Sequence, residues 1–308
     1  MNRSMRKIQQ LGVLTVFSTV VFLGASCGGN GGSGISSADL GRIVQTGVLL
    51  GSGDEEKAKQ YGNVAGSVSS LASDVSPEME YTLGEGLALR SYATIGPRLQ
   101  DETVQRYVNL VARSVVLQSS RPDLQFSVAV LDSETINAFA APGGFLFITT
   151  GALKRISNEA ELAAVLGHEV AHVTERHMIQ TYKRARLFEA ANQTLEALSA
   201  EEYSQDVDFG SDVLFNKGLD QKFEYEADSV GVQLAALTGY DPAEYLRFLN
   251  TLASLPNQQG GLLSTHPSAS SRIRNLQPLY ATDLKDFVGV GVQQQARYQA
   301  NVLNRLSP

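Results

Sequence analysis

The segment from Asn158 to His177, NEAELAAVLGHEVAHVTERH, decides the fold and carries the clearest chemical signal of the chain. Asn158 followed by Glu161 is a helix-capping pattern, and apolar residues then recur with a period of about 3.6. The segment therefore predicts a helix, and its alanines and glycine suit a buried, closely packed one. Within it, residues 168–172 read H-E-x-x-H.

The two histidines of this pattern favour a metal site. On a helix, residues four apart share a face, so His168 and His172 can direct ring nitrogens at one divalent ion, normally zinc. Glu169 can then act as a base towards a water molecule at that ion. The alternative is a helix with two incidental histidines, but with four histidines in the chain chance gives the pattern roughly three times in a thousand.

Composition limits the function classes. The chain has 308 residues, 43% of them hydrophobic and 19% charged, which is typical of a soluble globular protein. Its 25 Lys and Arg against 32 Asp and Glu give a net charge of −7, which argues against a nucleic-acid-binding protein. The single cysteine, Cys27, rules out an internal disulfide and a cysteine-based zinc site.

Residues 1–27 predict an export signal of the lipoprotein type. A basic start precedes the apolar run 11–23, which is shorter than the roughly 20 residues of a membrane-spanning helix. Small residues then lead to Cys27, which would become the lipidated first residue. An uncleaved anchor and an ordinary secretory signal are the alternatives. Gly28 rather than Asp after the cysteine favours the outer membrane, facing the periplasm.

The rest of the chain predicts one folded domain on a tether. Residues 28–76 are rich in Gly, Ser and Ala and indicate a flexible tether with short helices. A domain over 77–280 and a helical tail over 281–308 follow. Inside the domain we expect helices at 77–94 and 101–118 and strands at 125–131, 136–140 and 145–149. The predicted fold class is α+β, mostly helical with a small sheet.

Two histidines leave a catalytic zinc site one protein ligand short. The best source of a third is EYEAD at 224–228, on a predicted helix from Asp220 to Leu237. Glu224 and Asp228 share a face, so one carboxylate can bind metal while the other holds a ligand histidine in place. A solvated acidic helix face is the alternative.

Four motifs together resemble the M48 zinc metallopeptidases, over roughly residues 77–280. The resemblance implies a zincin-type peptidase domain with one zinc ion per chain. It also implies that Glu224 is the third ligand and that Asp228 supports a ligand histidine. The motifs are NAFAAPGG at 137–144, HEVAH at 168–172, EYEAD at 224–228, and His266-Pro267 followed by Arg272.

His266 and Arg272 have two site roles open to them through this resemblance. They can contact substrate or the transition state, or His266 can cap the zinc and gate it, as in one subgroup of the family. A helix start with Arg272 in a surface ion pair is the alternative. His177 lies five residues beyond His172, which on a continuous helix is a different face, so we expect a structural or surface role.

The sequence thus predicts a zinc metalloendopeptidase, with Glu169 as general base and acid. The strand over 144–150 resembles the family's edge strand, so Gly144, Phe145, Leu146 and Phe147 are expected to pair with extended or unfolded polypeptides. A lipid anchor at Cys27 and outer-membrane protein assembly machinery are the other expected partners. The predicted role is quality control in the cell envelope. The alternative is a zinc-containing periplasmic chaperone or assembly factor with a capped, weakly active site.

Overall fold

The structure, a computed structural model, describes residues 75–192, 208–255 and 265–306. Residues 76–182 and 201–308 form one compact unit, and the candidate site lies within it. The predicted signal, Cys27 and the tether over 28–74 lie outside the described residues. Within the described ranges, no helix is both long enough and apolar enough to cross a bilayer.

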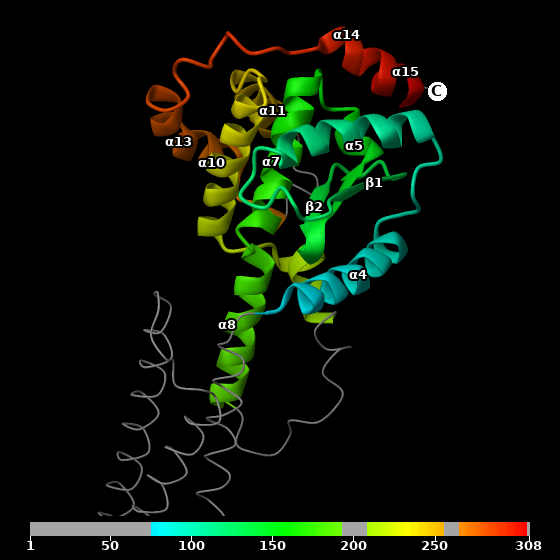
Figure 1. The fold of residues 1–308 in the computed structure, drawn as a ribbon, viewed down its shortest axis with the longest axis vertical. Helices are drawn as coiled ribbons and strands as arrows, with labels where there is room; N and C mark the ends of the chain where they lie inside the picture. Colours follow the sequence, from blue (N-terminus) through cyan, green and yellow to red (C-terminus); the bar gives the residue numbers. More distant parts are fainter. Residues whose placement is uncertain (1–74, 193–207, 256–264, 307–308) are drawn as a thin grey trace, which may run out of the picture. The chain divides into compact units, whose positions relative to one another are not determined.

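Three strands form a mixed sheet in the order β1-β3-β2 (Figure 1). β1 (Ser127–Leu131) runs parallel to β3 (Phe145–Thr149), and β2 (Ala138–Ala141) runs antiparallel to it. The turn Pro142–Gly144 joins β2 to β3, and Gly143 takes a φ of 75° there, which glycine adopts without strain. The predicted α+β class, mostly helical with a small sheet, is confirmed.

β3 is the central strand, so the prediction that it offers a substrate edge is wrong. Both of its sides are already paired, one with β1 and one with β2. Phe145, Leu146 and Phe147 therefore have no main-chain side left for a peptide, and Gly144 belongs to the preceding turn. The strand is last in the sequence but inserts between the other two, which sequence order cannot reveal.

The outer edge of β1 is closed by two amide side chains of α5 (Glu102–Val116). Gln105 donates to the carbonyl of Val130 (2.9 Å) and accepts from its N–H (3.1 Å). Asn109 makes the same pair of bonds to Val128, both at 2.8 Å. These two side chains, one helical turn apart, cover this edge together with the main chain of residues 97–99, where the N–H of Leu99 also donates to the carbonyl of Val130 (2.8 Å).

β2 is the edge strand on the other side of the sheet. The N–H of Thr149 donates to the carbonyl of Asn137 (3.0 Å), so Asn137 faces β3. Alternate residues of an antiparallel ladder face opposite sides, so the main-chain groups of Ala138 and Ala140 point outward. In the described ranges, no hydrogen bond joins these groups to a residue outside the sheet. Among the described residues, β2 is therefore the edge of the sheet whose outward main-chain groups are not paired, and all four of its residues are buried.

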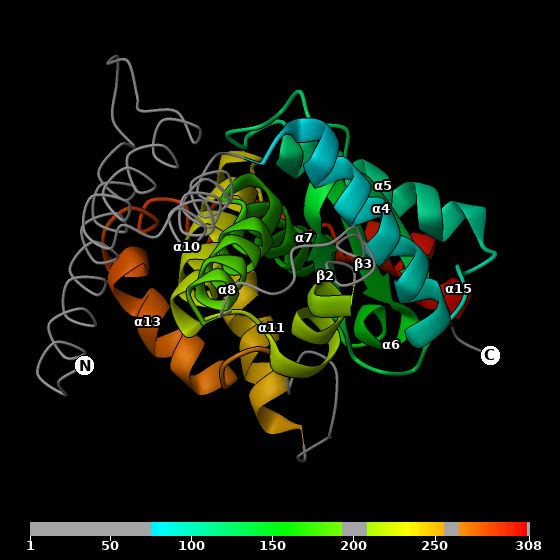
Figure 2. The same ribbon diagram turned by 90° about the horizontal axis from the view of Figure 1, so that it is seen from below.

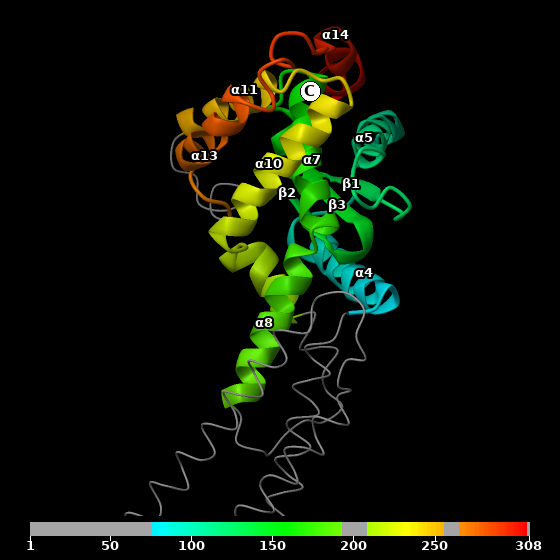
Figure 3. The same cartoon turned by 60° about the vertical axis from the view of Figure 1, so that its left-hand side comes forward.

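Helices surround the sheet. Figures 1 and 3 show α10 running alongside α7, and Figure 2 shows α4 lying near β2 and β3, which it contacts. The remaining bounds are α4 (Pro77–Thr94), α6 (Thr150–Leu153), α7 (Glu159–Thr174), α8 (His177–Asn192), η2 (Val213–Lys217), α10 (Gln221–Leu237), α11 (Ala243–Ser254), α13 (Ala269–Ala281), α14 (Gln295–Tyr298), η3 (Gln299–Leu303) and α15 (Asn304–Leu306).

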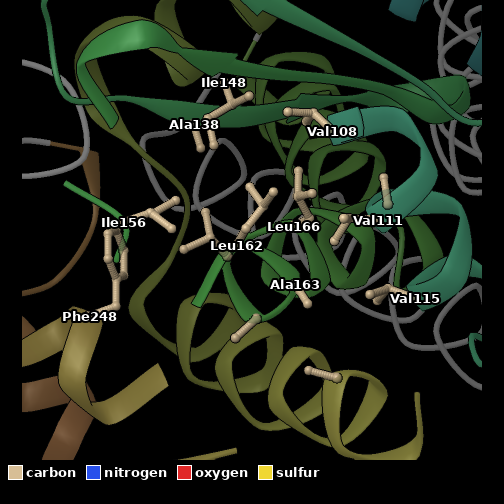
Figure 4. Close-up of a cluster of buried hydrophobic side chains, with 14 of the residues drawn as sticks. Val108, Val111, Val115, Ala138, Ile148, Ile156, Leu162, Ala163, Leu166 and Phe248 are labelled. Atoms are coloured by element: carbon tan, nitrogen blue, oxygen red, sulfur yellow. The ribbon is translucent and has the colours of Figure 1, made fainter. Parts of the chain in front are cut away.

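The helix carrying H-E-x-x-H lies in the middle of the core. Every residue of α7 is buried. In Figure 4, Leu162 and Leu166 of α7 lie between the sheet, represented by Ile148, and the helices α5 and α11, represented by Val111 and Phe248. Because packing surrounds this helix, its side chains are held in fixed positions, as a metal site requires.

α7 and α10 touch main chain to main chain at a pair of glycines. A Cβ atom added to Gly231 would lie 2.4 Å from the nitrogen of His168, and one added to Gly167 would lie 2.5 Å from the carbonyl oxygen of Gly231. No larger residue fits at this distance. The contact brings the acidic residues of α10 close to the histidines of α7.

The start of α7 is capped as the sequence predicts. The Asn158 side chain accepts from the N–H of Glu161 (2.9 Å), and the Glu161 carboxyl accepts from the N–H of Ser157 (2.7 Å). Burial raises the pKa of Glu161 to about 7. The protonated carboxyl is therefore favoured in the folded state.

Replacing Glu161 with glutamine is expected to stabilise the protein above pH 7. A raised folded pKa gives stability that is full below the unfolded value of 4.5 and is lost as the pH rises through about 7. Glutamine keeps the acceptor for Ser157 and cannot ionise, so the gain should reach about 1–3 kcal/mol at pH 8. Urea unfolding at pH 4.5, 6 and 8 measures it, with exposed Glu85→Gln as the control. A gain that does not depend on pH would contradict the pKa assignment.

The predicted C-terminal tail over 281–308 packs on the start of α7. It contains α14, η3 and α15, and its Tyr298 and Val302 are fully buried. The Tyr298 hydroxyl donates to the carbonyl of Leu153 (2.7 Å), and Arg297 donates to the buried carboxylate of Glu159 (2.6 Å). This segment thus helps to hold the start of α7, the helix that carries H-E-x-x-H, in place.

Candidate metal centre

Four side chains from three segments converge. The candidate ligand atoms of His168, His172, Glu224 and His266 all lie within 4.8 Å of one another. The Nε2 atoms of His168 and His172 are 3.0 Å apart, and the Glu224 carboxylate lies 3.6 and 3.5 Å from them, respectively. The structure therefore brings the two histidines of α7 together with the first glutamate of EYEAD on α10.

The chemistry of this donor set fits a divalent metal ion. Imidazole nitrogens and a carboxylate oxygen are ligands that zinc takes in proteins. The Nε2 atoms of the two histidines lie 3.0 Å apart, close enough for one ion to contact both. Nearby, Oε1 of Glu169 is buried and has no hydrogen-bond partner within the described residues, so a polar group is available beside the cluster.

The electrostatics of the ligands also suit a metal. Burial holds the pKa of His172 well below its usual value, which favours the neutral imidazole that binds metals. Burial would raise the pKa of Glu224, but His266, His172 and His168 outweigh it and lower the pKa well below normal. A carboxylate that stays ionised while buried among imidazoles is a strong ligand.

His168 has the opposite shift. Burial and Arg272 lower its pKa, but hydrogen bonds with Asp228 and Glu224 outweigh them and raise it to about 9. The ring is therefore held between two carboxylates, one on each nitrogen. A metal ion bound at Nε2 would displace the proton on that side.

Behind His168 lies a buried polar network. Asp228 approaches Nδ1 of His168 at 3.0 Å, and Arg272 donates to both carboxylate oxygens of Asp228, at 2.6 and 3.0 Å. The Tyr245 hydroxyl donates to Asp228 at 2.7 Å and lies 2.6 Å from Arg272. The network fixes the ring of His168, and Asp228 is placed to accept a proton from its Nδ1.

Two members of this network differ from the sequence-based expectation. Arg272, expected beside the substrate or in a surface ion pair, is buried and directs its guanidinium at Asp228 and Tyr245. Tyr245 was not expected at all, because nothing in the local sequence of α11 marks it. Only the packing of α11 against α7 reveals its role.

Glu169 lies beside the cluster without joining it. It lines a small cavity of about 30 Å³ together with two residues of β2 and three residues of the cluster. Burial raises the pKa of its carboxyl. A buried carboxyl with a raised pKa can accept a proton and later return it, as a general base and acid must. The other walls of the cavity are Phe139, Ala140, His172, Val213, Leu214, Gly218, Leu219, Glu224, Thr265 and His266.

His266 points into the cluster. Its Nδ1 hydrogen-bonds to the Glu224 carboxylate, and its ring centre lies 5.3 Å from that of His168. In this arrangement the imidazole occupies a place among the candidate ligands. The His266 ring would have to leave this place before it could contact an oxygen of the substrate.

We expected His177 on another face of the H-E-x-x-H helix, but it belongs to the next helix. α7 ends at Thr174, and Arg176 takes a left-handed φ of 57°, which interrupts the helix before α8 begins at His177. His177 is fully buried as a result, and its Nδ1 lies 2.9 Å from Nδ1 of His172. All four histidines of the chain are therefore gathered at this centre.

Comparison with known proteins agrees with this geometry. The family model described as Peptidase family M48 matches residues 98–279. The Beta-barrel assembly-enhancing protease of Escherichia coli (strain K12) is 25% identical over 260 residues, which cover 75% of this chain and 53% of that protein. The Mitochondrial metalloendopeptidase OMA1 of Schizosaccharomyces pombe is 33% identical over 178 residues, covering 56% and 51%. The chain spans about half the length of the curated relatives it matches. It belongs to peptidase family M48.

Proposed function

We propose that this protein is a zinc metalloendopeptidase that cleaves extended polypeptide segments. One observation carries the proposal: the ligand atoms of His168, His172 and Glu224 lie close together, and the buried carboxyl of Glu169 lines a cavity with two of these residues, His172 and Glu224. Family membership supports the same reaction class. The relatives named as proteases and metalloendopeptidases support it further.

In the proposed mechanism, His168, His172 and Glu224 hold the zinc ion. When bound, zinc supplies Lewis acidity, which polarises the scissile carbonyl and makes a water molecule acidic. Glu169 takes the proton of the attacking water on its carboxylate and delivers it to the nitrogen of the leaving amine. Asp228 and Arg272 hold His168 in the orientation that this site needs.

The substrate is proposed to bind as an added strand at β2. Ala138 and Ala140 are buried, so their outward main-chain groups would pair with an extended peptide only after the residues that cover them move aside. Ala140 and Phe139 also line the cavity that contains Glu169. Main-chain pairing tolerates many sequences. It requires a chain without secondary structure of its own, so unfolded or misassembled proteins are the proposed substrates.

The proposed setting is the cell envelope, where the lipid anchor at Cys27 would hold the enzyme at the periplasmic face of the outer membrane. The amino-terminal sequence supports this setting. The name of the Escherichia coli relative, a protease that enhances β-barrel assembly, supports a role near outer-membrane protein assembly machinery. Protein quality control is the role we propose.

A second candidate is a chaperone or assembly factor with a capped site. The position of His266 among the ligands favours it, because a fourth protein ligand would leave no place for water and substrate. The two candidates differ in whether His266 leaves the centre during the working cycle.

Replacing His266 with alanine is expected to raise peptidase activity, by about tenfold if capping is the main restraint. The variant should keep its zinc, because His168, His172 and Glu224 remain. Casein cleavage and zinc content, measured on the same preparations, give the two readouts. Unchanged activity would refute the gating role.

The first test of the function is zinc content and casein cleavage by the purified wild type. About one zinc ion per chain together with cleavage supports the protease. Zinc without cleavage, in both the wild type and His266→Ala, supports the capped binding protein. Absence of zinc binding would overturn both candidates.

A further inference from the structure

The fourth histidine of the centre has no task in the proposed mechanism. His177 is fully buried at the start of α8, and its ring stacks on Phe223 of α10 with the centres 4.5 Å apart and an angle of 20°. Its ring meets that of His172 edge-on, at 5.0 Å and 77°. This geometry holds His177 rigidly against one of the candidate ligands.

The positions of the protons follow from the positions of the nitrogens. His172 directs Nε2 at the cluster, where it lies 3.0 Å from Nε2 of His168. A nitrogen that binds metal carries no proton, so the proton of neutral His172 must be on Nδ1. That Nδ1 lies 2.9 Å from Nδ1 of His177. His172 therefore donates, and His177 must accept through an unprotonated Nδ1.

The same reasoning fixes the proton of His177. With Nδ1 accepting, the neutral ring carries its proton on Nε2. Nε2 of His177 lies 3.4 Å from the carboxylate of Glu226, whose side chain is 51% exposed. Glu226 is the middle acidic residue of EYEAD, between Glu224 and Asp228, and neither metal binding nor the support of His168 uses it. This nitrogen makes no hydrogen bond within the described residues, but a carboxylate 3.4 Å away favours the tautomer with the proton on Nε2 through its charge.

We propose that His177 is a positioning residue, which fixes the ring orientation of His172 and keeps the proton of His172 on Nδ1. Glu226 acts on the other side of His177, next to its Nε2. The inference rests on the proposed metal centre. The two histidines of H-E-x-x-H are then held by different means. Asp228 holds His168 directly, whereas a second imidazole, facing a carboxylate that reaches solvent, holds His172.

Zinc affinity tests the proposal without depending on activity. Competition with a chromophoric chelator is measured on the purified chain carrying His177→Leu or His177→Asn. Leucine removes the acceptor and should weaken zinc binding about 10–100-fold. Asparagine places an amide oxygen near the former Nδ1 and should restore affinity to within about threefold of the wild type. Equal affinity in His177→Leu and the wild type would overturn the proposal, as would equally weak binding by the leucine and asparagine variants.

A spectroscopic signature completes the test. In the zinc-loaded wild type, long-range ¹H–¹⁵N spectra of the four histidines should show His177 as the neutral tautomer protonated on Nε2. A His177 ring protonated on Nδ1 would overturn the proposal even if the leucine variant binds zinc weakly. Glu224→Gln tests the proposed metal centre separately from the positioning role of His177. If this variant binds zinc as tightly as the wild type, the proposed metal centre is wrong.

Discussion

Glutamine in place of Glu169 should abolish peptide cleavage and leave zinc in place. Glu169 is buried next to the cluster, but its carboxyl is not among the converging ligand atoms. The amide has the same size and fills the same cavity, yet it cannot take a proton from water. Loss of a general base costs about 10²–10⁴-fold in rate. Initial rates of casein cleavage and zinc content, measured side by side, give the result.

The matched control is Glu175→Gln, the same chemical change at the partly exposed end of α7. It should leave both rate and zinc content unchanged. If His266 keeps the wild type silent, the comparison is made in the His266→Ala background. Cleavage by Glu169→Gln within tenfold of its parent would remove the base assignment. Loss of zinc from that variant would instead make Glu169 part of the binding site.

Local signals in the sequence are enough to predict several of the helices and strands, whereas α6, α11 and α13 are not predicted individually. The helix predicted over 77–94 is observed as Pro77–Thr94, and the one predicted from Asp220 to Leu237 begins one residue later. The strand at 145–149 has the predicted bounds. Caps, Pro positions and the period of apolar residues all act within a few residues, so a sequence displays them directly.

The order of the strands could not be predicted in this way. Which strand becomes central depends on contacts between distant segments. Gln105 and Asn109 close the edge of β1 through side-chain amides, and in the sequence they are ordinary polar residues of an amphipathic helix. The sequence therefore predicts β3 as the edge strand, whereas β2 is the edge strand of the β2–β3 pair.

In the candidate site, too, the sequence predicts what depends on local spacing and does not predict contacts between distant segments. The spacing of His168 and His172 fixes their common face, so the motif alone predicts their convergence. Tyr245 reaches the site from another helix and leaves no mark in the motif. The sequence predicts His177 on a different face because it predicts one helix through this residue, whereas the left-handed conformation of Arg176 separates α7 from α8.

Gly231→Ala should have the second largest effect, on stability and on metal binding together. A Cβ atom at this position would lie 2.4 Å from the main-chain nitrogen of His168, and main chain cannot give way as a flexible side chain can. α10 must therefore move away from α7, which separates Glu224 from the histidines. Overpacking of this kind costs about 1–3 kcal/mol, and the upper end is expected here. Urea unfolding of the metal-free protein gives the stability, and chelator competition gives the zinc affinity.

The control is Gln233→Ala, two residues further along α10 and partly exposed, which changes helix propensity without approaching α7. It should alter stability by less than about 0.5 kcal/mol and leave zinc affinity unchanged. If Gly231→Ala lowers stability but binds zinc as tightly as the wild type, the ligands do not depend on the close approach of the two helices. If it lowers zinc affinity by more than about tenfold, then Gly231, which does not contact the metal, sets the distance between the histidines of α7 and Glu224 of α10. The glycine pair then belongs to the site as much as the motif does, because the H-E-x-x-H helix places two ligands and the helix crossing places the third.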